Sequence, residues 1–131
     1  MNIEEFITGI ITRLNTLGAK TFSPELPTVD DYDEDMALAV TLLGGKGQNS
    51  LGATRLYNTI LFRVIIRGAR DNDTETRELA DSVYNKLNMA HAIALTDSRI
   101  EIIYADSDIQ YIEKDENERI LYNINFRAII E

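Results

Sequence analysis

The segment RLYNTILFRVIIR, residues 55–67, alternates between two kinds of side chain along most of its length. Successive side chains of a strand point to opposite faces of a sheet, so this pattern predicts one long strand with one buried face. The face expected against a core is apolar: Leu56, Ile60, Phe62, Val64 and Ile66. The opposite face mixes arginine with apolar, hydroxyl and aromatic groups: Tyr57, Thr59, Leu61, Arg63, Ile65 and Arg67.

Upstream, residues 36–43 form an apolar run of strand length, and a glycine-rich stretch follows. Lysine beside glycine is typical of phosphate-binding loops, but Gly47 follows Lys46 where such a loop requires serine or threonine, and a strand follows instead of a helix. A tight hairpin needs only about two to five residues. We therefore expect either a flexible docking arm or a mobile tip without a partner, and the candidate arm residues are Gly44, Gly45, Lys46, Gly47, Gln48 and Asn49.

Helical periodicity marks two segments. In residues 3–17 the apolar side chains recur at helical spacing, and Gly18 stands where a helix commonly ends. In residues 73–88 Asp73 is the expected N-cap, and acidic residues fall near the positive end of the helix dipole. Both segments are predicted to be amphipathic helices.

The remaining segments complete the expected fold. Residues 20–35 contain Pro24 and Pro27 and predict a strand fragment followed by an exposed loop. Residues 99–104, 108–113 and 118–130 alternate, and the polar residues between them predict tight turns and a β-meander. The predicted class is α+β: a mostly antiparallel sheet with two main helices packed on one face, in the order α-β-β-α-β-β-β.

Composition narrows the class of protein. A chain of 131 residues, 44% hydrophobic and 27% charged, is the size of a single domain, residues 1–131. No apolar run approaches the roughly 20 residues of a membrane helix, and the first residues lack a secretory signal. A net charge of -9 disfavours a sequence-reading nucleic-acid binder. The absence of cysteine excludes disulfides and thiolate-ligated metals.

Charge is unevenly placed along the chain. Residues 25–35 are rich in acidic groups without a basic one, whereas residues 55–70 hold arginines without an acidic group. Arginine and tyrosine are favoured in interface cores, so the second face of the long strand is expected to meet a neighbouring copy. The alternative is that the protein's own helix or loop covers it. The subunit-interface candidates are Tyr57, Arg63, Arg67, Asp30, Asp31 and Asp33.

No residue set predicts catalysis. His91 is the sole histidine, and no serine lies in a G-x-S-x-G nucleophile elbow. The acidic run at 30–35, like Asp71, Asp73 and Glu75, offers oxygen ligands for a cation, but a solvated loop and helix capping explain these groups without a metal. We therefore expect no catalytic, cofactor or metal site, and no enzyme.

Three pieces of the sequence carry a family resemblance: Arg67-Gly68-Ala69-Arg70 leading to Asp73, the helix text from Ala80 to Leu87, and Asn125-Phe126-Arg127-Ala128. With the order of elements, they resemble the minor capsid or tail terminator (tail completion) proteins of long-tailed phages of Gram-positive bacteria. The resemblance covers nearly the whole chain, and none of its patterns is a catalytic signature.

This resemblance implies a structural protein that caps the tail tube as a ring, usually a hexamer, and docks to the head. Its partners would be further copies, the tail tube protein and head connector proteins, in the virion neck after assembly in the host bacterial cytoplasm. The alternatives are a head-completion protein of the same neck and a small-ligand-binding or enzymatic α+β domain. In the last case a pocket between helices and sheet would use Lys46, His91 or the acidic loop.

Overall fold

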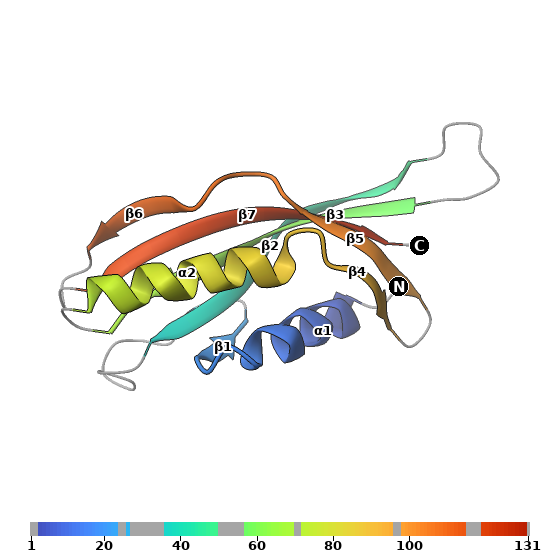
Figure 1. Ribbon diagram of the computed structural model, residues 1–131. Coiled ribbons are helices and arrows are strands. Elements are labelled where there is room, and N and C mark those ends of the chain that lie inside the picture. Colours follow the sequence, from blue (N-terminus) through green and yellow to red (C-terminus); the bar gives the residue numbers. More distant parts are fainter. Residues whose placement is uncertain are drawn as a thin grey trace.

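The computed structural model describes residues 3–23, 26, 36–49, 57–69, 72–95, 98–114 and 119–130; of residues 44–49, 57 and 58 it describes the backbone. Its strands form one sheet, and both helices lie on the same face of that sheet (Figure 1). The predicted α+β class is confirmed. The elements of the described chain are α1 (Ile3–Asn15), β1 (Lys20–Phe22), β2 (Ala37–Asn49), β3 (Tyr57–Arg67), α2 (Asp73–Leu87), β4 (His91–Ala94), β5 (Arg99–Ala105), β6 (Gln110–Lys114) and β7 (Ile120–Ile130).

The sheet is built around β3 and β7. The strand order is β1-β2-β3-β7-β5-β4, and β6 also pairs with β7. Every pair is antiparallel except β1 with β2, which is parallel. The register of β3 against β7 runs from Asn58 opposite Ile130 to Arg67 opposite Leu121. The mostly antiparallel sheet predicted from the sequence is therefore confirmed, with β3 and β7 at its centre.

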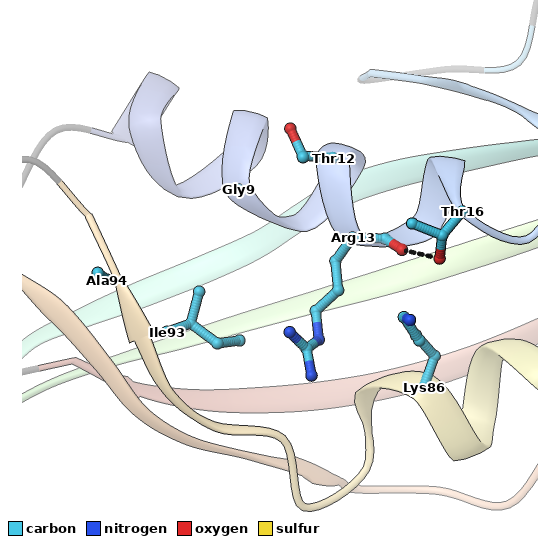
Figure 2. Close-up of a pocket in the computed structure, with 7 residues that line it drawn as sticks. All are labelled: Gly9, Thr12, Arg13, Thr16, Lys86, Ile93 and Ala94. Atoms are coloured by element: carbon cyan, nitrogen blue, oxygen red, sulfur yellow. Dashed lines mark hydrogen bonds between the residues drawn. The ribbon is translucent and has the colours of Figure 1, made fainter.

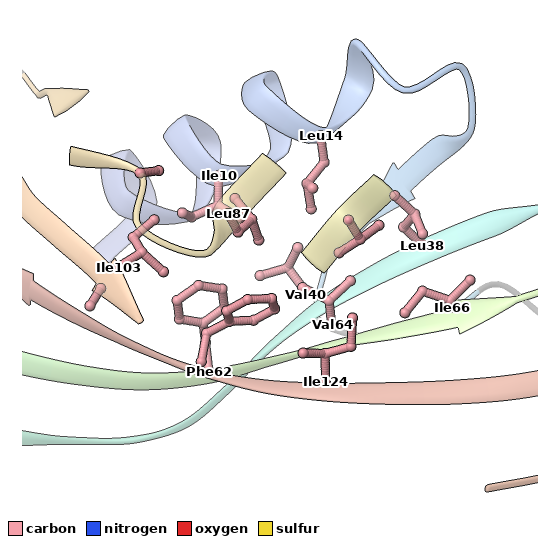
Figure 3. Packing of buried hydrophobic residues seen from close by; sticks show 14 of the residues in the cluster. Ile10, Leu14, Leu38, Val40, Phe62, Val64, Ile66, Leu87, Ile103 and Ile124 are labelled. Carbon is pink, nitrogen blue, oxygen red and sulfur yellow. The ribbon is translucent and has the colours of Figure 1, made fainter. Parts of the chain in front are cut away.

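The core lies between the sheet and the two helices. The alternation predicted for β3 is confirmed there, because its apolar residues Ile60, Phe62, Val64 and Ile66 are all buried. Figure 3 shows side chains from both helices pointing toward the sheet, among them Ile10, Leu14 and Leu87. Burying one such aliphatic or aromatic side chain contributes roughly 1.5–3 kcal/mol, so this layer supplies the main stabilisation of the fold.

The helix ends follow local chemistry. Gly18 adopts a φ of 88°, a left-handed conformation that suits glycine just after a helix. The N-cap of α2 is Asn72, so the expectation of Asp73 was wrong by one residue. Asn72 uses its side chain to donate from Nδ2 to Oε2 of Glu75 over 2.8 Å, and its carbonyl accepts from the amide of Thr76. Asp73 occupies the first helical position, where its negative charge still favours the dipole.

The glycine-rich stretch is strand rather than loop at its start. The prediction that the strand ends at residue 43 was wrong, because β2 continues to Asn49 and pairs Gly44 with Leu61 and Asn49 with Tyr57. Glycine keeps both backbone hydrogen-bonding groups, and register shifts at Leu42/Gly44 and Lys46/Gln48 accommodate it. At this end the β2–β3 pair extends past both helices (Figure 1). Residues 50–56, which follow the predicted arm, lie outside the described residues.

The predicted β-meander was wrong between β5 and β6, whereas the antiparallel pairing of β6 with β7 is confirmed. Both β5 and β6 pair antiparallel with β7, so they run in the same direction as successive parts of one interrupted strand. Across the interruption the amide of Asp106 donates to the carbonyl of Asn125 over 2.7 Å, and the amide of Asn125 donates to Oγ of Ser107 over 3.0 Å. The Ser107 hydroxyl thus accepts the hydrogen bond that a backbone carbonyl would accept in an uninterrupted strand. The chain therefore continues along the edge of β7 instead of reversing its direction. The sequence also did not predict the short strand β4 (His91–Ala94), in which Ala92 adopts a φ of 54°.

Replacing Ser107 by alanine is expected to lower the free energy of unfolding by about 1 kcal/mol, because the partly buried amide of Asn125 loses its acceptor. Urea denaturation measures the change. Ser82 is exposed on α2 and provides the matched control, since Ser82→Ala removes a hydroxyl without this role and favours the helix. Equal stability of Ser107→Ala and the wild type would contradict the bridging role.

Candidate functional site

The face of the sheet turned away from the helices is the first candidate surface, and we call it the outer face. Residues of β3 and β7 that alternate with the buried core positions form its centre. No helix of the described chain covers it, because α1 and α2 both lie on the opposite side (Figure 1). Its central side chains are Leu61, Arg63, Ile65, Asn125, Arg127 and Ile129.

Arg63 lies in the middle of the outer face, opposite Thr41 of β2 and Asn125 of β7. Its side chain is half-buried, and its Nε is enclosed without a hydrogen-bond partner. A cationic donor held in this way is costly unless something satisfies it. Apolar Leu61 and Ile65 flank it on the same strand, so the surface combines exposed hydrocarbon with one incompletely satisfied cation.

The other predicted interface residues differ in what the structure shows. Arg67 is only 4% exposed, so its guanidinium belongs to the fold of its own chain and offers little surface to a neighbour. Tyr57 pairs with Asn49 through its backbone, while its side chain lies outside what is described. Asp30, Asp31 and Asp33 also lie outside the described residues. The arm residues are described only as backbone, so their docking role stays a prediction.

Sequence reasoning did not include the contribution of β7 and β5 to the outer face. Arg127 stands opposite both Leu61 and Tyr104, and its Nη2 lies 3.4 Å from Oδ2 of Asp106. Tyr104 is 39% exposed, and Ile129 stands opposite Ile102. The alternation of residues 120–130 was a signal for these positions, but only the strand order shows that they adjoin Arg63.

A cavity of about 460 Å³ opens between α1, the end of α2 and β4 (Figure 2). Of the residues expected in the pocket of a ligand-binding domain, His91 is not in this lining, whereas the side chain of Lys46 and the acidic loop lie outside what is described. His91 is exposed, with Nδ1 3.2 Å from the carbonyl oxygen of Met89. The lining residues are Gly9, Thr12, Arg13, Thr16, Lys86, Ile93 and Ala94.

The acidic groups at the start of α2 have structural partners. Glu75 accepts from Asn72, and Oδ2 of Asp73 lies 3.8 Å from Nζ of Lys114, whereas Asp71 is outside the described residues. Within the described ranges no group of three or more histidine, cysteine, aspartate or glutamate residues is arranged to hold a metal ion. The helices that are described include none long and apolar enough to cross a membrane.

Comparisons with known proteins agree with this architecture. A chain in a solved structure described as "Virion of native gene transfer agent (GTA) particle" superposes with a TM-score of 0.70 at 13% sequence identity. The match covers 98% of this chain and 96% of that one, so the two share a fold over their whole length. No curated protein sequence matches the chain.

A family model described as "Bacteriophage tail terminator protein" matches residues 14–131, from the last turn of α1 through β7. This range includes both central strands of the outer face and the whole of α2. The resemblance drawn from the sequence is thereby confirmed. The chain belongs to the bacteriophage tail terminator family and is a structural protein of the phage head–tail junction.

Proposed function

We propose that this protein closes the end of the tail tube as a ring, hexameric as is usual for such caps, and docks to the filled head. Its partners would be further copies, the tail tube protein and head connector proteins, brought together in the host bacterial cytoplasm and retained in the virion neck. The role requires protein contacts and no catalysis, membrane or sequence-specific nucleic acid. Support comes from the family match over residues 14–131.

The observation that carries the ring is the outer face. Arg63 keeps an enclosed donor without a partner, and the apolar groups beside it are partly exposed in the single chain. A neighbouring copy would cover this hydrocarbon and supply an acceptor, for which the acidic residues Asp30, Asp31 and Asp33 have the complementary charge. When two different patches meet, each copy binds the next head to tail. The copies form a closed ring when the rotation between neighbouring subunits divides a full turn evenly.

The ends of the ring would meet other proteins. The β2–β3 pair extends past the helices, so its tip can reach beyond the body of a subunit. We propose that the segment from Gly44 to Asn49 orders against the tube or the connector. A head-completion protein would use comparable contacts on the other side of the same junction, and addition of purified tails distinguishes the two, since only a terminator caps the tube end.

Native mass spectrometry over a wide protein concentration range tests the ring. We expect a discrete closed oligomer, most tellingly a hexamer, and we expect Arg63→Glu to remove it at a cost of about 2–5 kcal/mol for each subunit contact. Arg77→Glu provides the control, because Arg77 lies on α2 on the opposite side of the sheet and should leave assembly intact.

Circular dichroism confirms that both variants are folded before the comparison is made. Retention of the ring by a folded Arg63→Glu protein would exclude the outer face as the subunit contact. A wild-type chain that stays monomeric at high concentration, also with purified tails present, would contradict the ring itself.

A further inference from the structure

The cavity between the helices and β4 is positively charged. Arg13 extends from α1 and Lys86 from the last turn of α2, and Figure 2 shows both side chains reaching into the same space, with Ile93 beside Arg13. Thr12 on α1 and Thr16 just after the helix are exposed along this space, and Thr16 already donates its hydroxyl to the carbonyl of Arg13 over 2.8 Å. The outer face plays no part in this cavity, since the sheet separates the two.

Neither cation has an acidic partner among the described residues. Both side chains are half-buried, and Nε of Arg13 is enclosed without a hydrogen-bond partner. Two like charges that share a partly desolvated space repel each other, and a bound anion removes that repulsion. The rest of the chain is strongly acidic, with a net charge of -9, so these cations form a local site of opposite sign.

The walls of the cavity favour an anion that also carries hydrocarbon. Ile93 and Ala94 of β4 form an apolar side, and Gly9 closes the opposite wall. A Cβ at Gly9 would lie 3.2 Å from Cδ2 of Leu95, so glycine lets the segment after β4 approach α1 closely. A glutamate or aspartate side chain in a peptide fits such walls, with its methylene groups on the apolar side and its carboxylate between the cations.

We propose that the Arg13–Lys86 cavity binds an acidic segment of a partner protein in the tail assembly. The planar guanidinium of Arg13 would hold one carboxylate through paired hydrogen bonds, and the ammonium of Lys86 would supply the second charge. Nucleic acid is disfavoured, since a phosphate backbone needs an extended array of cations, whereas the described lining of this cavity offers two, Arg13 and Lys86. The identity of the partner rests on the proposed place in the virion, whereas the preference for carboxylates is a property of the single chain.

Titration of the full ¹⁵N-labelled chain with tetraglutamate, followed by amide chemical shifts, tests the proposal. We expect shifts concentrated at Gly9, Arg13, Lys86 and Ala94, and none with tetraglutamine. The double variant Arg13→Gln, Lys86→Gln should bind tetraglutamate at least tenfold more weakly. Arg77→Gln is the control, because it removes one positive charge on α2 outside the described lining of the cavity and should leave binding unchanged.

A further variant, two further ligands and a measurement of the ring complete the test. Arg13→Lys keeps the positive charge but loses the planar guanidinium, so it should bind tetraglutamate with part of the wild-type affinity. This variant takes the place of the double variant in the test if the double variant does not fold. Binding of inorganic phosphate or a single-stranded oligonucleotide more tightly than tetraglutamate would overturn the proposal, as would the absence of shifts at the cavity. Native mass spectrometry measures ring formation independently of peptide binding. A wild-type chain that forms the ring but does not bind tetraglutamate would therefore contradict the Arg13–Lys86 site and leave the proposed function standing.

Discussion

Replacing Phe62 by alanine is expected to lower the free energy of unfolding by about 3–5 kcal/mol. Phe62 is fully buried, and its ring stacks on Phe126 at a centroid distance of 5.3 Å and meets Phe6 edge-on at 5.5 Å. The truncation therefore removes contacts to β7 and to α1 together and leaves a cavity where the helices meet the sheet. Domains of this size are stabilised by only about 5–15 kcal/mol in total, so the variant loses much of its margin.

Urea denaturation measures this loss, and Ile112→Ala is the control because Ile112 is 45% exposed on β6. Phe62→Leu should cost less, since it keeps most of the buried volume. A double-mutant cycle with Phe126→Leu isolates the ring contact, for which a coupling of about 0.5–1.5 kcal/mol is expected. If Phe62→Ala proved no more costly than Ile112→Ala, the central position assigned to this ring would be incorrect.

Replacing Gly68 by alanine is the second change with a large expected effect. Gly68 follows β3, donates its amide to the carbonyl of Ile120 over 2.9 Å, and lies against the first turn of α2. An added Cβ would collide with Oγ1 of Thr76 and would lie 2.8 Å and 2.9 Å from its Cγ2 and Cβ. Thr76 cannot rotate freely, because its hydroxyl donates to the carbonyl of Asn72 over 2.6 Å. We expect a loss of about 1–3 kcal/mol or more in unfolding free energy.

Calorimetric or urea unfolding of the pair Gly68→Ala and Thr76→Ala identifies the cause. The double variant should be more stable than the sum of the two single losses predicts, because Thr76→Ala removes two of the three clashing atoms. Gly9→Ala is the matched control: its Cβ meets only the end of the Leu95 side chain, and alanine favours the helix. Strict additivity of Gly68→Ala and Thr76→Ala would show that the cost arises elsewhere.

The sequence predicted the parts of the fold that repeat with a regular period. The alternation in residues 55–67 and the spacing of Phe6, Ile10 and Leu14 are local patterns, and each produced the expected element. The direction of the chain after Ala105 could not be predicted, because polar residues such as Asp106 and Ser107 suit a turn as well as an interruption within one strand edge. The strand through Gly44 was missed since glycine has low strand propensity, and pairing with β3 overrode it.

The candidate sites depended more on tertiary structure. Arg63 and Arg67 are equivalent in the sequence pattern, yet the first remains half-exposed and the second is buried within its own fold. The cavity joins Arg13 of α1 to Lys86 of α2, two residues in separate helices that no local spacing connects. Predicting their meeting requires knowledge of how both helices lie on the sheet.

The central position of β7 has a consequence for synthesis. β7 is the last strand in chain order, yet it pairs with β3, β5 and β6. During translation, β3 has only β2 beside it until residues 120–130 have left the ribosome, and such long-range pairing is slow to form. The outer face exists only once β3 and β7 lie side by side, so a nascent chain displays no finished surface to other copies on the same polysome.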